Sequence, residues 1–136
     1  MRFRKCYLGL KETSIMTTDL PVINGGEIKI YSHDSILFKE GEIGHYMYIL
    51  IDGKIKVTKN NKAIANITEM GSSIGELSFL LNLPYSATCR SVGETKVIAI
   101  NLTEDFFENN PNFLLHIAKN LATKLIAANR SKLIYF

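Results

Sequence analysis

Short apolar runs separated by polar turns fill the first hundred residues of the chain. "GEIKIY", "SILF", "AIANI" and "TKVIAI" are brief β-favouring runs, and residues 54–58 alternate between polar and apolar side chains as a strand with one solvated face does. Asp52-Gly53 and the segment "KNNK" contain residues that favour tight turns. Strands this short, at intervals of about ten residues, predict an antiparallel sandwich or barrel rather than a parallel sheet with crossover helices.

After Ile100 the spacing of the apolar residues changes from a strand-like to a helical pattern. Thr103 followed by two acidic residues predicts the N-cap of a short helix, and Asn110 before Pro111 predicts a second helix start. Neither proline nor glycine interrupts the chain from Asn112 onward, so a long helix is expected. Its apolar residues recur at three- and four-residue spacing: Leu114, Leu115, Ala118, Leu121, Ala122, Leu125 and Ile126.

A helix of more than about 20 residues would overrun a small β-domain. Part of its apolar stripe is therefore expected to meet another chain, which predicts a homodimer through the C-terminal helix. The length of 136 residues suits one domain, with residues 1–20 as a tail and 21–136 as the domain including the helix.

Composition narrows the class of protein. With 46% apolar and 21% charged residues the chain is typical of globular proteins, and no apolar run approaches the roughly 20 residues that span a bilayer. The N-terminus lacks a signal-peptide core. Cys6 and Cys89 form neither a disulfide framework nor a closely spaced ligand pair. We expect a cytoplasmic protein without a membrane segment.

Basic residues gather at the two ends of the chain. Residues 1–11 and 111–136 each carry four basic residues and no acidic one, which leaves the middle with 8 bases and 13 acids. Such ends can attract nucleic acid or acidic lipid, but cations spread along a helix more often form a solvated face. Because the chain stops at Phe136, no helix-turn-helix is expected to follow, and sequence-specific nucleic acid binding is not predicted.

Enzymatic chemistry is not indicated. His33, His45 and His116 stand far apart, whereas metal sites use closely spaced ligands. No nucleophile with an evident base and no P-loop is present. We therefore predict a protein that is not an enzyme and has no metal and no cofactor.

The segment "GSSIGELSFLLNLPYSATC" contains the candidate site. Glycine and serine directly precede a short apolar segment of helical character, so free backbone N–H groups at its start could hold an anion. Glu76 would lie among these donors, where it could cap the turn or accept hydrogen bonds from a sugar's hydroxyl groups. On spacing alone, Glu76 could merely cap the turn and Gly75 merely permit a bend. Ser86 and Thr88 add hydroxyl groups at alternate positions.

"GELSFLLNLPYSAT" resembles the phosphate-binding cassette of cyclic-nucleotide-binding domains, of the type found in catabolite activator proteins and regulatory subunits of cAMP-dependent protein kinase. That cassette is approximately Gly-Glu-Leu-x-Leu, several residues, then Arg-Ser/Thr-Ala-Thr. "ILFKEGEIGHYMYILIDGKIKV" is similar to the paired strands of the family, and "ITEMGSSIGE" to its approach to the cassette. The resemblance covers roughly residues 25–130. It implies a mainly β fold: an eight-stranded antiparallel jelly roll (a cupin-like β-roll) with a short cassette helix and a long C-terminal helix.

The resemblance also implies a role for each matching residue. The ligand would be cAMP or cGMP. Glu76 would bind the ribose 2′-hydroxyl, and Ser86 would donate to a phosphate oxygen. The backbone of residues 75–77 would help to hold the cyclic phosphate. The ligand-binding residues so implied are Gly75, Glu76, Leu77, Tyr85, Ser86, Ala87 and Thr88.

Tyr85 departs from the pattern, because the family has arginine at this position. A phenol replaces a planar fork of charged donors with at most one neutral donor, and without a nearby cation Glu76 would repel an incoming phosphate. Arg90 is expected to point away from a pocket that Ser86 and Thr88 line, whereas Lys119 or Lys124 could reach in from the long helix. Tyr85 could instead fill the pocket as a packed aromatic ring, which would leave the domain without a ligand, or the site could bind another, less anionic small ligand.

The sequence thus predicts a non-catalytic sensor domain of cyclic-nucleotide-binding type with weakened or lost nucleotide binding. Ligand entry is expected to shift the packing of the C-terminal helix, since a ligand can bias only a conformation that it contacts differentially. The alternative is a ligand-free module for dimerisation and protein interaction.

Overall fold

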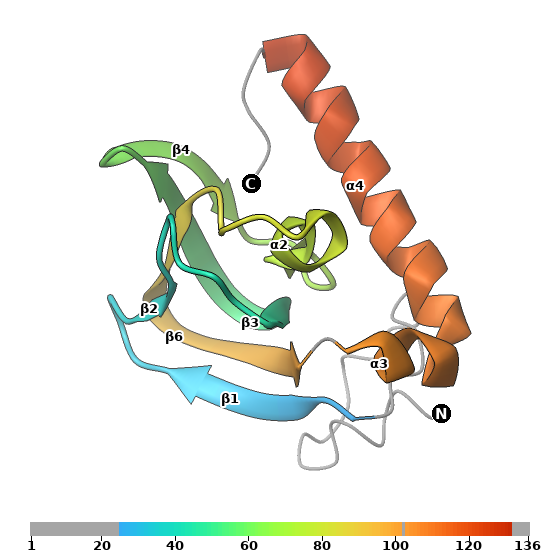
Figure 1. The fold of residues 1–136 in the computed structure, drawn as a ribbon. Coiled ribbons are helices and arrows are strands. Elements are labelled where there is room, and N and C mark those ends of the chain that lie inside the picture. The colour runs from blue at the N-terminus through green and yellow to red at the C-terminus, as the bar shows by residue number, and fades with distance from the viewer. Residues whose placement is uncertain (1–24, 102, 132–136) are drawn as a thin grey trace.

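The computed structural model describes residues 25–101 and 103–131 and shows an antiparallel β-roll followed by two helices. The tail predicted for residues 1–20 lies outside this range. Figure 1 shows the curved strands of the roll, the short helix α2 and the long helix α4, which passes beside α2. The elements are β1 (Glu27–Tyr31), β2 (Ile36–Phe38), β3 (Tyr46–Lys59), β4 (Lys62–Ile67), β5 (Ser73–Ile74), α2 (Glu76–Leu81), β6 (Thr88–Asn101), α3 (Glu104–Asn109) and α4 (Pro111–Ser131).

All strand pairs are antiparallel, in the order β1-β6-β3-β4, with β2 paired to β6 and β5 paired to β3. This confirms the predicted β-roll with a short and a long helix. The described residues form six strands rather than eight, because β3 and β6 each continue for 14 residues through positions where shorter strands were expected to end.

Asp52-Gly53 is not the hairpin turn that its composition predicted. The dipeptide lies within β3, where the register against β6 shifts on both sides of Asp52. Gly53 has φ +104°, and a Cβ there would lie 2.7 Å from the carbonyl oxygen of Glu94. Glycine is therefore required because two backbones approach closely at an irregularity in the sheet.

The "KNNK" turn is confirmed. Asn60 and Asn61 have φ values of 53° and 65°, the left-handed conformation that a two-residue hairpin turn needs and that asparagine tolerates. Lys59 pairs with Lys62 across the turn. The local sequence therefore determines where β3 ends and β4 begins.

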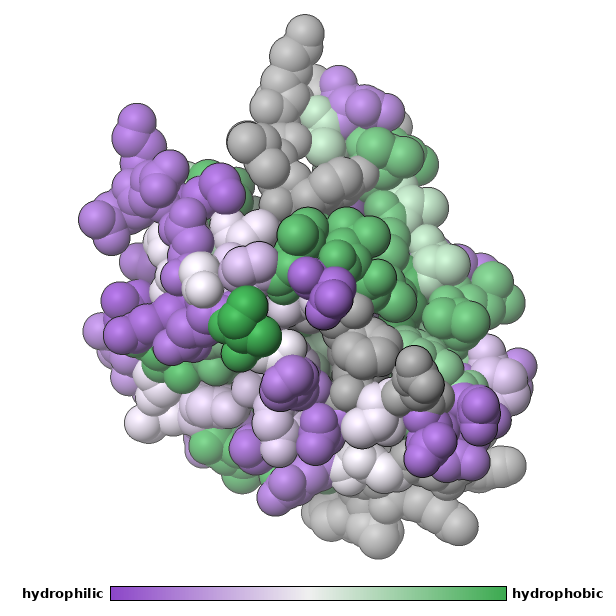
Figure 2. Space-filling model, viewed as in Figure 1, coloured by the Kyte–Doolittle hydropathy of each residue, from purple (hydrophilic) through white to green (hydrophobic). Residues whose placement is uncertain are grey.

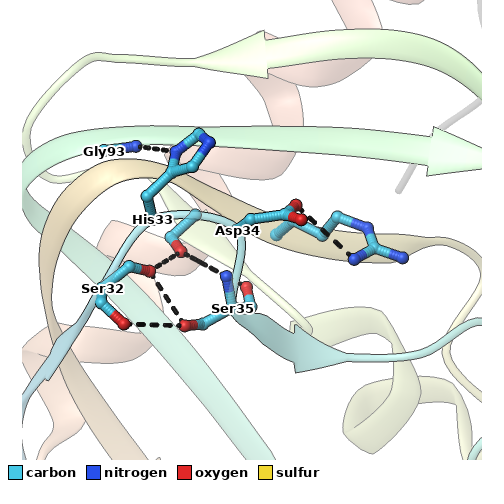
Figure 3. Close-up of polar contacts among 7 residues, drawn as sticks. Ser32, His33, Asp34, Ser35 and Gly93 are labelled. Atoms are coloured by element: carbon cyan, nitrogen blue, oxygen red, sulfur yellow. Dashed lines mark hydrogen bonds and ion pairs between the residues drawn. The ribbon is translucent and has the colours of Figure 1, made fainter.

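Hydrogen bonds fasten the connection between β1 and β2 to β6, as Figure 3 shows. Asp34, with φ 63°, donates its backbone N–H to the carbonyl of Ser91 at 2.9 Å. His33 Nδ1 accepts from the backbone N–H of Gly93 at 2.8 Å, and the backbone N–H of Ser35 donates to Ser91 Oγ at 2.9 Å. These contacts fix the corner where the chain passes from one edge of the roll to β2.

Two apolar clusters lie on either side of the strands. One fills the roll: Leu37, Phe38, Tyr48, Leu50, Ile55, Val57, Ile67, Ile74, Tyr85, Ala87, Cys89, Val97 and Ala99. The other lies beneath the helices: Met47, Ile49, Ile51, Ile98, Ile100, Phe106, Phe113 and Ile117. The adjacent runs of buried residues in β3 and β6 are explained by this arrangement, because both faces of these strands are covered.

The helix starts are as predicted. Thr103 Oγ1 accepts from the backbone N–H of Phe106 at 3.2 Å, which is the N-cap contact. Helix α4 begins at Pro111, and Asn110 also closes α3, since its Nδ2 donates to the carbonyl of Phe106 at 2.9 Å.

The buried face of α4 differs from the apolar stripe predicted from the sequence. Phe113 and Ile117 are buried and Leu121 is partly buried against the same cluster, whereas Leu115 is 59% exposed and Ile126 53% exposed. The helix thus carries two apolar faces, and most of the predicted stripe is the outer one. Among the described residues, no helix is long and apolar enough to cross a membrane.

Candidate functional site

The candidate site begins where β5 turns directly into α2. Gly75 has φ +88° at this junction, and a Cβ there would lie 3.1 Å from the carbonyl oxygen of Tyr46 and 3.3 Å from the Phe38 ring. Glycine is therefore needed for both the backbone conformation and the space. The result is a sharp turn that presents the start of α2 against β3.

Glu76 is the first residue of α2, and its side chain is fully buried. Its Oε2 accepts a hydrogen bond from Nζ of Lys124 at 3.1 Å. Lys124 comes from α4 and also donates to the carbonyl oxygen of Ser73 at 2.8 Å. Of the two helix lysines considered from the sequence, Lys124 therefore reaches the cassette and neutralises Glu76.

The second carboxylate oxygen of Glu76 differs from the first. Within the part of the chain that the structure describes, Oε1 is buried and has no hydrogen-bond partner. A buried carboxylate oxygen without a donor is costly, and a hydroxyl or N–H group that reached it would satisfy it. This atom is the strongest sign of a ligand position at the cassette.

Tyr85 is buried beside the start of α2. Its ring stacks on Phe38, with ring centroids 3.9 Å apart, and its hydroxyl donates to the carbonyl oxygen of Tyr46 at 2.8 Å. Burial raises the pKa of the Tyr85 phenol, so the hydroxyl stays protonated and remains a donor. The Tyr85 hydroxyl has a single hydrogen, and that hydrogen is already donated to the carbonyl oxygen of Tyr46. Tyr85 therefore cannot donate to a phosphate without breaking this contact.

The loop before β3 closes over the Tyr85 ring. Gly44 lies so near that a Cβ at this position would overlap the Tyr85 side chain. The backbone N–H of Gly41 donates to the carbonyl of Tyr85 at 2.8 Å, and the backbone N–H of Tyr85 donates to the carbonyl of Glu42 at 2.9 Å. Tyr85 is therefore held as a core residue, which is the packed arrangement considered from the sequence.

Residues 85–89 alternate between the interior and the outside of the roll. Tyr85, Ala87 and Cys89 are buried in its interior cluster. Thr88 is on the other side, and its Oγ1 accepts from the backbone N–H of Glu40 at 2.9 Å. The carbonyl oxygen of Ser86 accepts from Lys59 Nζ at 2.8 Å.

Arg90 is directed away from the cassette, as predicted, but the expectation that it lies on the opposite side from Thr88 is wrong. Thr88 and Arg90 are two residues apart in β6 and therefore share a face. Arg90 forms an ion pair with Asp34, with 3.6 Å between Nη1 and Oδ1. The interior side of this segment belongs instead to Tyr85, Ala87 and Cys89.

Three residues of the site could not be identified in advance. Phe38 and Tyr46 contact Gly75 and Tyr85, and Ser73 binds Lys124 through its carbonyl. Their sequence signals are those of ordinary strand residues. Leu77, predicted as a backbone ligand contact, lies in the first turn of α2 next to Glu76.

The thiol of Cys89 is buried beneath this site. Burial raises its pKa from 9.0 to about 12, so in a Cys6→Ser variant we expect no reaction with a thiol reagent at pH 8 until the chain is denatured. Between about pH 9 and 12 the native chain keeps a proton that the unfolded chain loses, and the free energy of unfolding should fall as pH rises through this window. Rapid thiol modification of the native variant at pH 8 would contradict this placement.

Comparison with known proteins assigns the fold to a family. A family model described as "Cyclic nucleotide-binding domain" matches residues 27–108, which is more than half of the chain. The chain belongs to the cyclic nucleotide-binding domain family. The match confirms the resemblance seen in the sequence and includes both the Glu76 turn and the Tyr85 segment.

Solved structures of this family share the architecture. A PKAR CBD2 domain bound to Sp-2Cl-cAMPS is 30% identical, with a TM-score of 0.63, over 81% of this chain and 74% of that one. The Thermus thermophilus catabolite activator protein is 23% identical, with a TM-score of 0.61, over 79% of this chain and 51% of that one, and shows the fold alone.

Curated relatives are much longer proteins. Rap guanine nucleotide exchange factor 1 of Caenorhabditis elegans is 36% identical over 46% of this chain and 6% of its own length. Human cGMP-dependent protein kinase 2 is 28% identical over 58% of this chain and 10% of its own length. The matched region is thus a small part of each relative.

Proposed function

We propose that this domain is a non-catalytic sensor of the cyclic-nucleotide class in which Tyr85 has reduced the affinity for cyclic nucleotide. The proposal rests chiefly on the buried Glu76, whose Oε1 lacks a hydrogen-bond partner among the described residues. In the family pattern this glutamate binds a ribose hydroxyl, and Glu76 is still positioned to accept one. The unsatisfied oxygen of Glu76 favours a retained position for the sugar of a ligand, whereas the packed Tyr85 ring counts against an ordinary phosphate site, so we propose reduced rather than full affinity.

Charge at the site also favours a weakly bound anionic ligand. The repulsion expected between Glu76 and a phosphate is offset by Lys124, whose Nζ lies 3.1 Å from the carboxylate. The missing arginine still removes at least one charged hydrogen bond worth roughly 1.5 to 3 kcal/mol, which corresponds to about a tenfold to hundredfold loss of affinity. Either cAMP or cGMP satisfies this chemistry.

A nuclear magnetic resonance titration of the amide signals tests the proposal. Millimolar cAMP or cGMP should shift the signals of Gly75, Glu76, Leu77 and Ala87, whereas 5′-AMP, which lacks the cyclic phosphate, should shift them less. The same titration of a Glu76→Gln variant should show weaker binding, because a neutral amide replaces the acceptor of the ribose hydroxyl. Unchanged cassette signals at saturating cyclic nucleotide would contradict a ligand-sensing role.

The second candidate function is dimerisation, favoured by the outer face of α4. Figure 2 shows apolar residues gathered over α2 and along α4. Leu115 and Leu125 are 59% and 48% exposed, and with the exposed Ala118 and Ala122 they follow the 3-4-3 spacing of a coiled-coil seam. We propose that a second copy of the chain covers this seam through its own α4.

Charge introduced into the seam should separate such a dimer. A Leu115→Glu/Leu125→Glu variant is expected to have the monomer mass by light scattering at micromolar concentration, while the wild-type chain has twice that mass. Both positions are exposed, so the fold should remain intact by circular dichroism. A wild-type chain that has the monomer mass would contradict the proposed dimer.

A further inference from the structure

Glu76 is buried close to the apolar interior of the roll. Its side chain is shielded from solvent, and Oε1 has no hydrogen-bond partner among the described residues. The thiol of Cys89, which belongs to the interior cluster, interacts electrostatically with both Glu76 and Lys124. A group that reaches Oε1 is therefore itself removed from water, and any charge that it carried there would need a partner of opposite sign.

The basic side chains around the cassette already have carboxylate partners. Lys124 contacts the start of α2, and Lys59 donates to the carbonyl oxygen of Ser86 at 2.8 Å. Arg90 follows in β6. Their ion pairs span 3.1, 3.9 and 3.6 Å respectively: Lys124 with Glu76, Lys59 with Glu40, and Arg90 with Asp34. A phosphate would have to compete with a carboxylate for each of these cations, whereas an uncharged ligand would not.

The two ends of the cassette thus suit different chemical groups. At one end Tyr85 places an aromatic ring, whose only hydrogen-bond donor is used by Tyr46. At the other end Glu76 keeps an acceptor whose partner is missing among the described residues. A ligand that carries hydroxyl groups but no phosphate satisfies both ends.

A nucleoside has this chemistry. In a 3′,5′-cyclic nucleotide the phosphate takes up the 3′ and 5′ oxygens, so only the 2′-hydroxyl of the ribose can donate a hydrogen bond. A nucleoside has free hydroxyl groups at both the 2′ and the 3′ position and carries no charge. A carboxylate has about four acceptor positions, and the printed contact of Lys124 uses one oxygen of Glu76, so Glu76 can accept from such a pair of hydroxyl groups.

We propose that the cassette binds an uncharged nucleoside more tightly than the corresponding cyclic nucleotide. The ribose hydroxyl groups donate to Glu76, Lys124 stays paired with Oε2 and offsets the carboxylate, and the Tyr85 ring fills the space beside the sugar that a phosphate would need. The inference rests on the ligand site of the proposed function and names the class of ligand that this site prefers.

Dissociation constants from nuclear magnetic resonance titrations of the wild-type chain test the preference. Adenosine or guanosine should bind about tenfold or more tightly than cAMP or cGMP, and 2′-deoxyadenosine about tenfold to a hundredfold more weakly than adenosine, because a hydrogen bond to a charged group is lost. Cyclic nucleotides that bind as tightly as the nucleosides would overturn the inference and leave the proposed function standing. Binding of nucleosides alone would support the inference and overturn cyclic nucleotide sensing, and binding of neither class would overturn both.

Variants of the two ends separate their roles. A Tyr85→Arg variant should reverse the preference and bind cAMP more tightly than adenosine, whereas Tyr85→Phe, which keeps the ring, should retain the preference for adenosine. Glu76→Gln should weaken adenosine binding about tenfold or more. Glu69→Gln is its matched control, since Glu69 is an exposed glutamate shortly before the cassette. Equal adenosine affinity in folded Glu76→Gln and Glu69→Gln chains would overturn the inference; the 2′-deoxyadenosine comparison needs no variant and decides the matter if Glu76→Gln does not fold.

Discussion

Replacing Lys124 with methionine is expected to lower the free energy of unfolding by roughly 3 to 5 kcal/mol, the usual cost of removing one partner of a buried ion pair. Methionine keeps an apolar stem of similar length, so the change isolates the lost charge. Glu76 is fully buried, and without Lys124 its Oε2 would lose the ion pair, which spans 3.1 Å, while Oε1 already lacks a hydrogen-bond partner among the described residues. Urea denaturation followed by circular dichroism measures the difference.

Two controls show whether the lost charge causes the expected fall in the free energy of unfolding. Lys119→Met removes an exposed lysine of the same helix and should change the free energy of unfolding by no more than about 0.5 kcal/mol. Glu76→Gln/Lys124→Met removes both charges and should recover most of the loss, because no unpaired buried charge remains. A Lys124→Met chain as stable as the wild type would contradict the buried pair.

Tyr85→Ala is expected to lower the free energy of unfolding by roughly 3 to 5 kcal/mol, the range for truncating a buried aromatic side chain. Tyr85 is 6% exposed and its ring stacks on Phe38, so truncation leaves a cavity beneath the loop that contains Gly44. Urea denaturation followed by circular dichroism also measures this fall in the free energy of unfolding.

The Tyr85→Phe variant separates the contribution of the ring to stability from that of the hydroxyl. This variant keeps the stack on Phe38 and loses only the hydrogen bond to the carbonyl of Tyr46, so its cost should be about 1 kcal/mol. If Tyr85→Ala cost no more than Tyr85→Phe, the ring would not be part of the core, and the packed arrangement would be wrong.

Local signals in the sequence predicted much of the fold. The Asn60-Asn61 turn and the Thr103 cap are decided by a few neighbouring residues, so they could be read directly. Asp52-Gly53 could not, because its conformation depends on the backbone of Glu94 and Thr95 in the partner strand. The same glycine that permits a hairpin turn also permits an irregularity within a long strand.

Helix α4 shows why the spacing of apolar residues alone could not identify the buried face of the helix. Apolar residues occupy both the inner face, with Phe113 and Ile117, and the outer face, with Leu115 and Leu125. The spacing predicts a helix in either case, but only the position of the β-roll determines which face is buried. The more leucine-rich face is the exposed one.

The cassette was predictable because its residues are contiguous. Gly75 and Glu76 form one turn, and the structure places Tyr85 beside it through the Phe38 ring. The contact between Glu76 and Lys124 spans 48 residues of sequence, and no local pattern distinguished Lys124 from Lys119. That contact changes the electrostatics of the site, since the carboxylate has the cation that the sequence alone left unassigned.

Calorimetric titration of the wild-type chain and a Tyr85→Arg variant with cAMP and cGMP tests the central claim most directly. Arginine restores the charged donors that a cyclic phosphate needs, so the variant should bind about tenfold to a hundredfold more tightly than the wild type. Circular dichroism should first show that the variant is folded. A folded Tyr85→Arg chain that binds neither nucleotide, or binds no better than the wild type, would contradict a retained nucleotide site weakened by Tyr85.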